Sequence, residues 1–229
     1  MLLHASWEDV VFLHFLVEPR ELRRLLPDPL RLDLPLGEAW LSLVALRTRG
    51  PAPLPPRLLR GLPTYSQINV RTYVEHEGER GIFFLDQMVS STTMAAAARL
   101  LGVHQRSAEV RVARAGETID VRLDGERAAL AARVRVAGPT VTAARDLIGA
   151  ALLERYVGFD GSPPRRTAIE HAPWVIQKLD VESLETHDLL PSGARLAAAH
   201  FGTPRVVAVG IPHAVPGAVE TGPFVAEPA

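Results

Sequence analysis

The segment from Tyr65 to Val74 carries the side chains of this sequence that are best suited to recognise a small molecule. Successive side chains of a β-strand point to opposite faces, so every second residue of the segment shares a face. One face holds five polar or aromatic residues: Tyr65, Gln67, Asn69, Arg71 and Tyr73. A guanidinium can hold a carboxylate through two parallel hydrogen bonds, while amides and phenols orient it. Such a face can therefore bind an anionic ligand.

A β-hairpin is expected to place further residues beside this face. Strand-like segments at 64–75 and 81–87 flank a turn that contains glycine, His76–Glu79. Centring the turn on Glu77 and Gly78 predicts three cross-strand pairs, which are Arg71 with Phe84, Asn69 with Asp86, and Gln67 with Met88. Asp86 then becomes the diagonal neighbour of Arg71 and the nearest partner for its charge.

Periodicity alone leaves two interpretations of this polar face open. A half-buried antiparallel strand normally turns a polar face to water, and such a face needs no function. A ligand pocket, in contrast, combines an apolar lining with a few convergent polar groups, as Phe84, Asp86 and the odd-numbered positions would.

The composition excludes several kinds of chemistry. The 229 residues include no cysteine, which rules out disulfides, thiolate nucleophiles and cysteine-ligated metals. Lys178 is the only lysine, and its neighbour Asp180 is typical of an exposed position, although a catalytic amine remains the alternative. The eight histidines show no zinc-helix spacing. We therefore expect neither a metal nor a cofactor.

Charge and hydropathy bear on the partners and location of the protein. The formal net charge is −1, which gives no general attraction to nucleic acid or to an anionic membrane. No apolar run reaches the length of a membrane span, and the first residues lack the features of a secretory signal. We expect a cytoplasmic protein that forms a single domain over residues 1–229 and binds a small molecule. A homo-oligomer is compatible with the sequence.

The elements that position the candidate residues are expected to be mainly strands. Expected strands, besides the hairpin, are a buried strand at 10–17, a strand pair at 30–34 and 39–46, and a three-strand meander at 109–136. Expected helices run over 19–26, from Ser90 or Ser91 to Leu101, and from about 140 to 158, the last being the longest. Serine and threonine at 90–93 are interpreted as capping residues rather than nucleophiles.

Several short motifs of one known family occur together, in the expected order, over roughly the first three-quarters of the chain. They are Trp7 with the apolar strand after it, Pro19-Arg20-Glu21-Leu22 through Leu26-Pro27, Gly37-Glu38-Ala39-Trp40, Asn69-Val70-Arg71-Thr72-Tyr73-Val74, Gly81-Ile82-Phe83-Phe84-Leu85-Asp86 and His171-Ala172-Pro173-Trp174. The segment from Asn69 to Val74 is the most specific of them. On these motifs the chain resembles the uncharacterised YqjF-like proteins of the acetoacetate decarboxylase-like superfamily.

The resemblance implies a β-rich α+β fold, namely a closed, cone-like antiparallel β-barrel with a few peripheral helices and a ligand in its interior. It also implies that the polar face of the Asn69–Arg71 strand points inward. Decarboxylases of that superfamily form a Schiff base between a lysine and a keto acid. The segment in which the family resemblance leads us to expect that lysine, Gly102–Ser107, contains none, and Gln67 replaces an acidic residue that is often found in relatives.

Three functional hypotheses remain. The first is a lyase or isomerase that acts on a small carboxylate or carbonyl compound without a Schiff base. In it, Arg71 holds the anion, and Asp86 or His104 moves a proton. Arg106 shares the segment of His104 and is a further candidate for ligand binding. The second is a non-catalytic binder of a small apolar or amphipathic ligand, and the third is a structural protein whose polar strand faces solvent.

Overall fold

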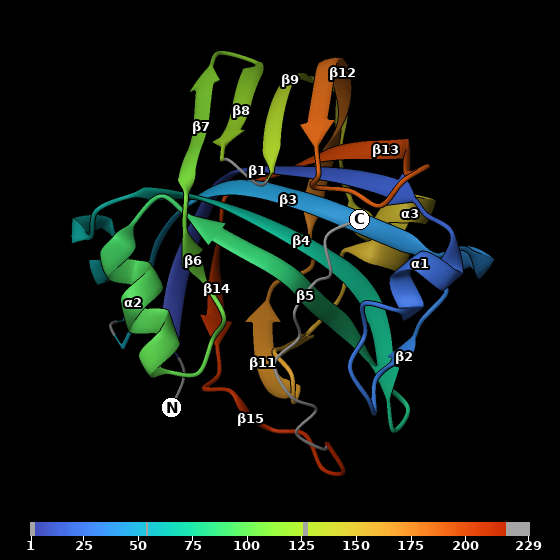
Figure 1. The fold of residues 1–229 in the computed structure, drawn as a ribbon. Coiled ribbons are helices and arrows are strands. Elements are labelled where there is room, and N and C mark those ends of the chain that lie inside the picture. Colours follow the sequence, from blue (N-terminus) through green and yellow to red (C-terminus); the bar gives the residue numbers. More distant parts are fainter. Residues whose placement is uncertain (1–2, 54, 126–127, 219–229) are drawn as a thin grey trace.

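A computed structural model describes residues 3–53, 55–125 and 128–218 of the chain. Within these ranges, seven strands close into a barrel (Figure 1). In order around the barrel they are β1 (Leu3–Leu16), β3 (Trp40–Ala52), β4 (Tyr65–His76), β5 (Glu79–Val89), β10 (Val157–Asp160), β11 (Arg165–His171) and β14 (Arg205–Val209). The β14–β1 pairing closes the ring, and β5–β10 is its parallel pair. The predicted closed barrel is confirmed.

Strand β1 is shared by the barrel and by a branch of the same continuous sheet, which is called the second sheet below. Its residues Leu3–Trp7 pair with β14, whereas Val10–Leu16 pair with β13. The change of partner coincides with a bulge on the β3 side, between Glu8 and Val11. Bulges of this kind bend a strand and increase its twist. At the bulge, Asp9 has a φ of 50° and its carboxylate accepts a hydrogen bond from Arg47 at 3.1 Å.

A second sheet extends from the far half of β1 and lies against the outside of the barrel, in the upper part of Figure 1. Its strands, in order from β1, are β13 (Arg195–Gly202), β12 (Val175–His187), β9 (Ala129–Thr142), β8 (Thr118–Asp124) and β7 (Glu109–Ala115). The last three form the predicted meander.

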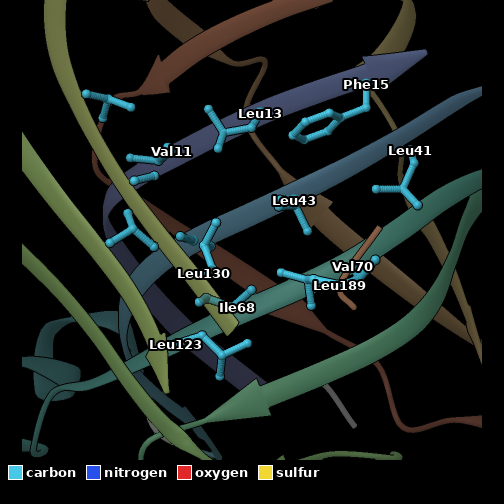
Figure 2. Packing of buried hydrophobic residues seen from close by; sticks show 14 of the residues in the cluster. Val11, Leu13, Phe15, Leu41, Leu43, Ile68, Val70, Leu123, Leu130 and Leu189 are labelled. Atoms are coloured by element: carbon cyan, nitrogen blue, oxygen red, sulfur yellow. The ribbon is translucent and has the colours of Figure 1, made fainter. Parts of the chain in front are cut away.

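The largest apolar core lies between this second sheet and the outer face of the barrel. Figure 2 shows alternate residues of β1 in this core, among them Leu13 and Phe15, together with Ile68 and Val70 of β4. Because side chains alternate along a strand, burying the even positions of β4 here directs the odd positions into the barrel. The core thus sets the orientation of the polar face.

The helices are short and peripheral. The α-helices are α1 (Pro19–Arg23), α2 (Thr92–Leu100) and α3 (Leu147–Leu152), and 3₁₀ turns cover Pro35–Gly37, Pro56–Gly61 and Ala143–Arg145. The short strands are β2 (Arg31–Leu32), β6 (Arg106–Ser107) and β15 (His213–Ala214). Ser91 caps α2 by accepting a hydrogen bond from the Met94 backbone N–H, as predicted.

Two predictions about elements are wrong. The long helix at 140–158 is replaced by the end of β9, a 3₁₀ turn and the six-residue α3, since Val141 and Thr142 pair with β12. Strand pairing across the sheet here overrides the local helical pattern. The expected pair of strands at 30–34 and 39–46 does not form either, because β2 pairs with β4 instead.

The structure also bears on the membrane question. Over the described ranges, no helix is both long enough and apolar enough to cross a membrane. The cytoplasmic location remains a prediction.

Two leucine substitutions test the position of the core. Leu13 is 2% exposed and Leu100 is 89% exposed. We expect Leu13→Ala to lower the free energy of unfolding by about 2–5 kcal/mol, because it leaves a cavity between the sheets. Leu100→Ala is expected to change it by less than about 0.5 kcal/mol. Urea denaturation of both variants measures this, and equal losses would contradict the packing described above.

Candidate functional site

The barrel contains a cavity that leaves about 130 Å³ for the centre of a water-sized sphere. Helix α2 and the segment after it line the end where Tyr65 lies. Tyr73 lies at the opposite end, packed with Trp40 and Ile82. The polar side chains that line the cavity are Thr48, Tyr65, Gln67, Asn69, Arg71, Gln87, Gln105, Arg155, Asp160, Thr167 and His171. Most of the remaining lining is apolar.

Four of the five residues of the predicted polar face line this cavity. They are Tyr65, Gln67, Asn69 and Arg71, all of them buried, and Phe84 joins them from β5. The fifth, Tyr73, is completely buried beyond the cavity. The polar face of β4 therefore points into the barrel rather than to solvent.

Asp86 does not lie beside Arg71, so that prediction is wrong. Arg71 pairs with Phe84 as expected, but a bulge between Val70 and Arg71 shifts the register, so that Asn69 pairs with Gln87 and Asp86 with Val70. Gln87 takes the inward position instead.

The carboxylate of Asp86 forms an ion pair with another candidate residue. Arg106 Nη2 lies 2.7 Å from Asp86 Oδ2, and the two side chains are partly exposed. Neither residue is among those that line the cavity.

His104 also lies outside the cavity, although it contacts a residue within it. Its side chain is largely exposed, and its backbone N–H donates to Asp160 Oδ2 at 2.6 Å. Asp160 is buried and lines the cavity. Burial raises the pKa of the Asp160 carboxyl, an effect that the hydrogen bond from His104 partly offsets. Asp160 is thus the buried carboxyl group that the cavity offers for proton transfer.

The strand register relates Asp160 to Arg71. Phe84 pairs with Arg71 on one side and with Asp160 on the other, so the three residues lie at the same level of three adjacent strands. Two strand spacings, about 10 Å, separate the Arg71 and Asp160 backbones. A small ligand between them can contact both side chains.

Arg71 is a buried cation without a carboxylate partner among the described residues. Its Nε has no hydrogen-bond partner, and its guanidinium lies 5.6 Å from the centre of the Phe12 ring. Burial lowers its pKa, and the neighbouring Tyr73 phenol works against this. The nearby Arg155 is satisfied by Asp33, at 2.8 Å. An uncompensated buried charge is unfavourable, so this site favours an anion.

The rest of the cavity suits an apolar body. Trp7 and Trp174 stack with ring centres 6.2 Å apart, and both line the cavity together with Val44 and Leu46. Polar groups at one level and an apolar lining around them are typical of a small-molecule site.

Among the described residues, the cavity lining includes no lysine amine, and no cluster of metal-binding side chains occurs. Lys178 is exposed on β12 and is not among the residues that line the cavity. Over the described ranges, no group of three or more histidine, aspartate or glutamate residues could hold a metal ion.

Several residues that line the cavity were not predicted from the sequence, notably Gln87, Gln105, Arg155 and Asp160. The alternation of Gly158 and Asp160 would have marked an inward face, but this segment followed a predicted helix. Gln87 was missed because the bulge is not visible in the hydrophobic pattern.

Comparisons with known proteins bear on the fold and the family. A model of the family described as "Uncharacterized conserved protein", DUF2071, matches residues 4–210. The "Uncharacterized protein YqjF" of Bacillus subtilis (strain 168) is 27% identical over 187 residues, which are 79% of this chain and 77% of that protein. The resemblance inferred from the motifs is confirmed.

Solved structures share the fold. The enduracididine biosynthesis enzyme MppR complexed with pyruvate has a TM-score of 0.68 at 16% identity, over 93% of this chain and 90% of that one. An acetoacetate decarboxylase-like enzyme from Sphingomonas wittichii RW1 has a TM-score of 0.66 at 14% identity, over 93% and 92% of the two chains.

A pair of arginine substitutions tests the charge balance of the site. Arg71→Met removes an unpaired buried charge, so we expect the free energy of unfolding to stay equal or to rise. Arg155→Met leaves the Asp33 carboxylate without its close partner, so we expect the free energy of unfolding to fall by roughly 3 kcal/mol. This value is at the lower end of the usual cost of breaking a buried ion pair, because Arg80 remains 3.8 Å from Asp33. Denaturation at pH 7 measures both, and a strongly destabilised Arg71→Met would indicate an overlooked partner.

Proposed function

The chain belongs to the DUF2071 family of uncharacterised conserved proteins, and from that premise we propose that its barrel is the active site of a lyase or isomerase for a small carboxylate that also carries a carbonyl group. The observation that carries this proposal is the unpaired Arg71 guanidinium inside a mostly apolar cavity. Its charge selects an anion, and its planar fork suits a carboxylate.

In this proposal the polar residues of β4 bind and orient the ligand. Arg71 holds the carboxylate. Gln67 Nε2 donates to Asn69 Oδ1 at 2.8 Å, which fixes the Asn69 amide and leaves its nitrogen to donate to a ligand oxygen. Phe84, between Arg71 and Asp160, packs against the carbon skeleton of the ligand.

Proton transfer is assigned to Asp160 in place of Asp86 or His104. An ionised Asp160 can accept a proton from the carbon next to the ligand's carbonyl group, and the resulting acid can return it to another atom of the same ligand. The raised pKa of the carboxyl makes it a stronger base than an ordinary aspartate. The exposed His104 holds Asp160 in place through its backbone N–H.

The structural neighbours support the ligand class by analogy of fold. MppR is described as complexed with pyruvate, a small keto acid, and other neighbours are acetoacetate decarboxylase-like enzymes. Folds host many functions, so this analogy adds to the argument from Arg71 and does not replace it. In this proposal no Schiff base forms, because the segment Gly102–Ser107 has no lysine and Lys178 is exposed and does not line the cavity.

A non-catalytic binder of an amphipathic ligand is the second candidate function. The apolar walls, with Trp7 and Trp174, favour it, since they suit a body larger than pyruvate. An experiment in heavy water distinguishes an enzyme from a binder, because only an enzyme catalyses the exchange of ligand C–H protons for deuterium. We expect Asp160→Asn to abolish that exchange.

Substitution of Arg71 tests the anion site. We expect Arg71→Lys to weaken pyruvate binding about tenfold and Arg71→Met about a hundredfold, since each step removes part of a bidentate charged contact. Arg106→Met, which removes an arginine outside the cavity, is the matched control and should bind as wild type. Calorimetric titration measures the affinities. Unchanged binding in both folded Arg71 variants would remove Arg71 from the site.

The exposed position of Lys178, the only lysine, gives a second prediction. We expect no acetoacetate decarboxylation above the rate in buffer, since the Schiff-base route needs a primary amine in the cavity and the only lysine, Lys178, is exposed and does not line it. Carbon dioxide release that disappears in Lys178→Ala would contradict this.

A further inference from the structure

A cluster of completely buried polar side chains lies beside Arg71 and does not line the cavity. Its members are His14, Ser42 and Tyr73, each of them 0% exposed. His14 of β1 pairs with Ser42 of β3, and Ser42 pairs with Arg71 of β4. The cluster therefore lies directly beside the proposed anion-binding residue, and the function proposed above does not use it.

Hydrogen bonds join the three side chains of the cluster, and Tyr73 connects them to Arg71. Tyr73 follows Arg71 by two residues on the same face of β4, and its phenol raises the pKa of the Arg71 guanidinium as a hydrogen-bond acceptor would. Tyr73 Oη lies 2.7 Å from Ser42 Oγ, which lies 2.8 Å from His14 Nδ1. A guanidinium can only donate, so the Tyr73 oxygen must accept from it. The phenol hydrogen is then available to donate to Ser42, and the Ser42 hydroxyl to donate to His14.

This order of donors fixes the state of His14. With this order of donors Nδ1 of His14 accepts, so the neutral ring carries its proton on Nε2, a buried atom with no hydrogen-bond partner among the described residues. Burial lowers the pKa of His14 well below its usual value, and the charges of His200 and Arg71 act in the same direction. His200, whose ring centre lies 5.3 Å away, has Nε2 3.3 Å from Asp146 Oδ1. The hydrogen-bonded side chains Tyr73, Ser42 and His14 include no carboxylate, and the Asp146 carboxylate contacts His200 instead.

We propose that Tyr73, Ser42 and His14 are positioning residues that hold the Arg71 guanidinium toward the cavity while leaving its charge free for a ligand carboxylate. The inference rests on the proposed function and deepens it. A carboxylate in place of the Tyr73 phenol would hold the guanidinium equally well, but it would compete with the ligand for the positive charge. A neutral chain provides the geometry without that competition.

A spectroscopic test needs no ligand. In ¹⁵N spectra of the histidine rings at pH 7, we expect His14 to show an unprotonated Nδ1 and a protonated Nε2. Ser42→Ala removes the donor to Nδ1, so the preference for this tautomer should weaken, whereas Thr72→Val should leave it unchanged. Thr72 is an equally buried hydroxyl of β4 that donates to the Trp40 carbonyl on the other face of the strand. A charged His14, or one protonated on Nδ1, overturns the inference.

Pyruvate titration supplies the functional readout. We expect Tyr73→Phe and Ser42→Ala to weaken pyruvate binding about tenfold, with Thr72→Val at the wild-type affinity. If Arg71→Met loses binding but both chain variants bind as wild type, the positioning role is wrong and the proposed function stands. If Arg71→Met binds as wild type, the proposed function fails. Thermal unfolding of each variant confirms that it is folded.

Discussion

The apolar contact between the second sheet and the outer wall of the barrel is the interaction on which the site depends. It buries Ile68 and Val70 of β4, and a slip of one residue would turn both of them away from this core and into the barrel. With those positions fixed, Gln67, Asn69 and Arg71 have only the barrel interior to enter. The hydrophobic free energy gained on the outside of the barrel thus offsets the unfavourable burial of polar groups on its inside.

Much of this arrangement follows from the sequence, and the rest depends on pairing that no local pattern encodes. Alternation along β4 predicted which residues share a face, and the hairpin turn correctly paired Arg71 with Phe84. The family resemblance, not periodicity, indicated that the face points inward. The one-residue bulge between the Val70 and Arg71 pairs turns Asp86 away from the barrel interior and Gln87 toward it. A bulge leaves composition and hydrophobicity unchanged, so the sequence could not reveal it.

The missed carboxyl group has a different cause. Asp160 lies on a four-residue strand that pairs in parallel with β5, far away along the chain, and the sequence before it looks helical. Local propensity is a weak guide where pairing partners are distant. The same limit explains the short α3, since Val141 continues β9 beside β12. The candidate site was therefore predictable where it lies on the hairpin and not where it lies on strands brought in from the second half of the chain.

Strand β1 has a consequence for the dynamics of the whole molecule. One edge of it pairs with β3, while the other edge passes from β14 to β13 at the bulge near Asp9. The second sheet cannot separate from the barrel without breaking hydrogen bonds of this shared strand. Local unfolding follows contiguous cooperative units, so amide hydrogens on both sides of the bulge should exchange through one common opening. Fluctuations in the second sheet would then reach the cavity through the backbone of β1.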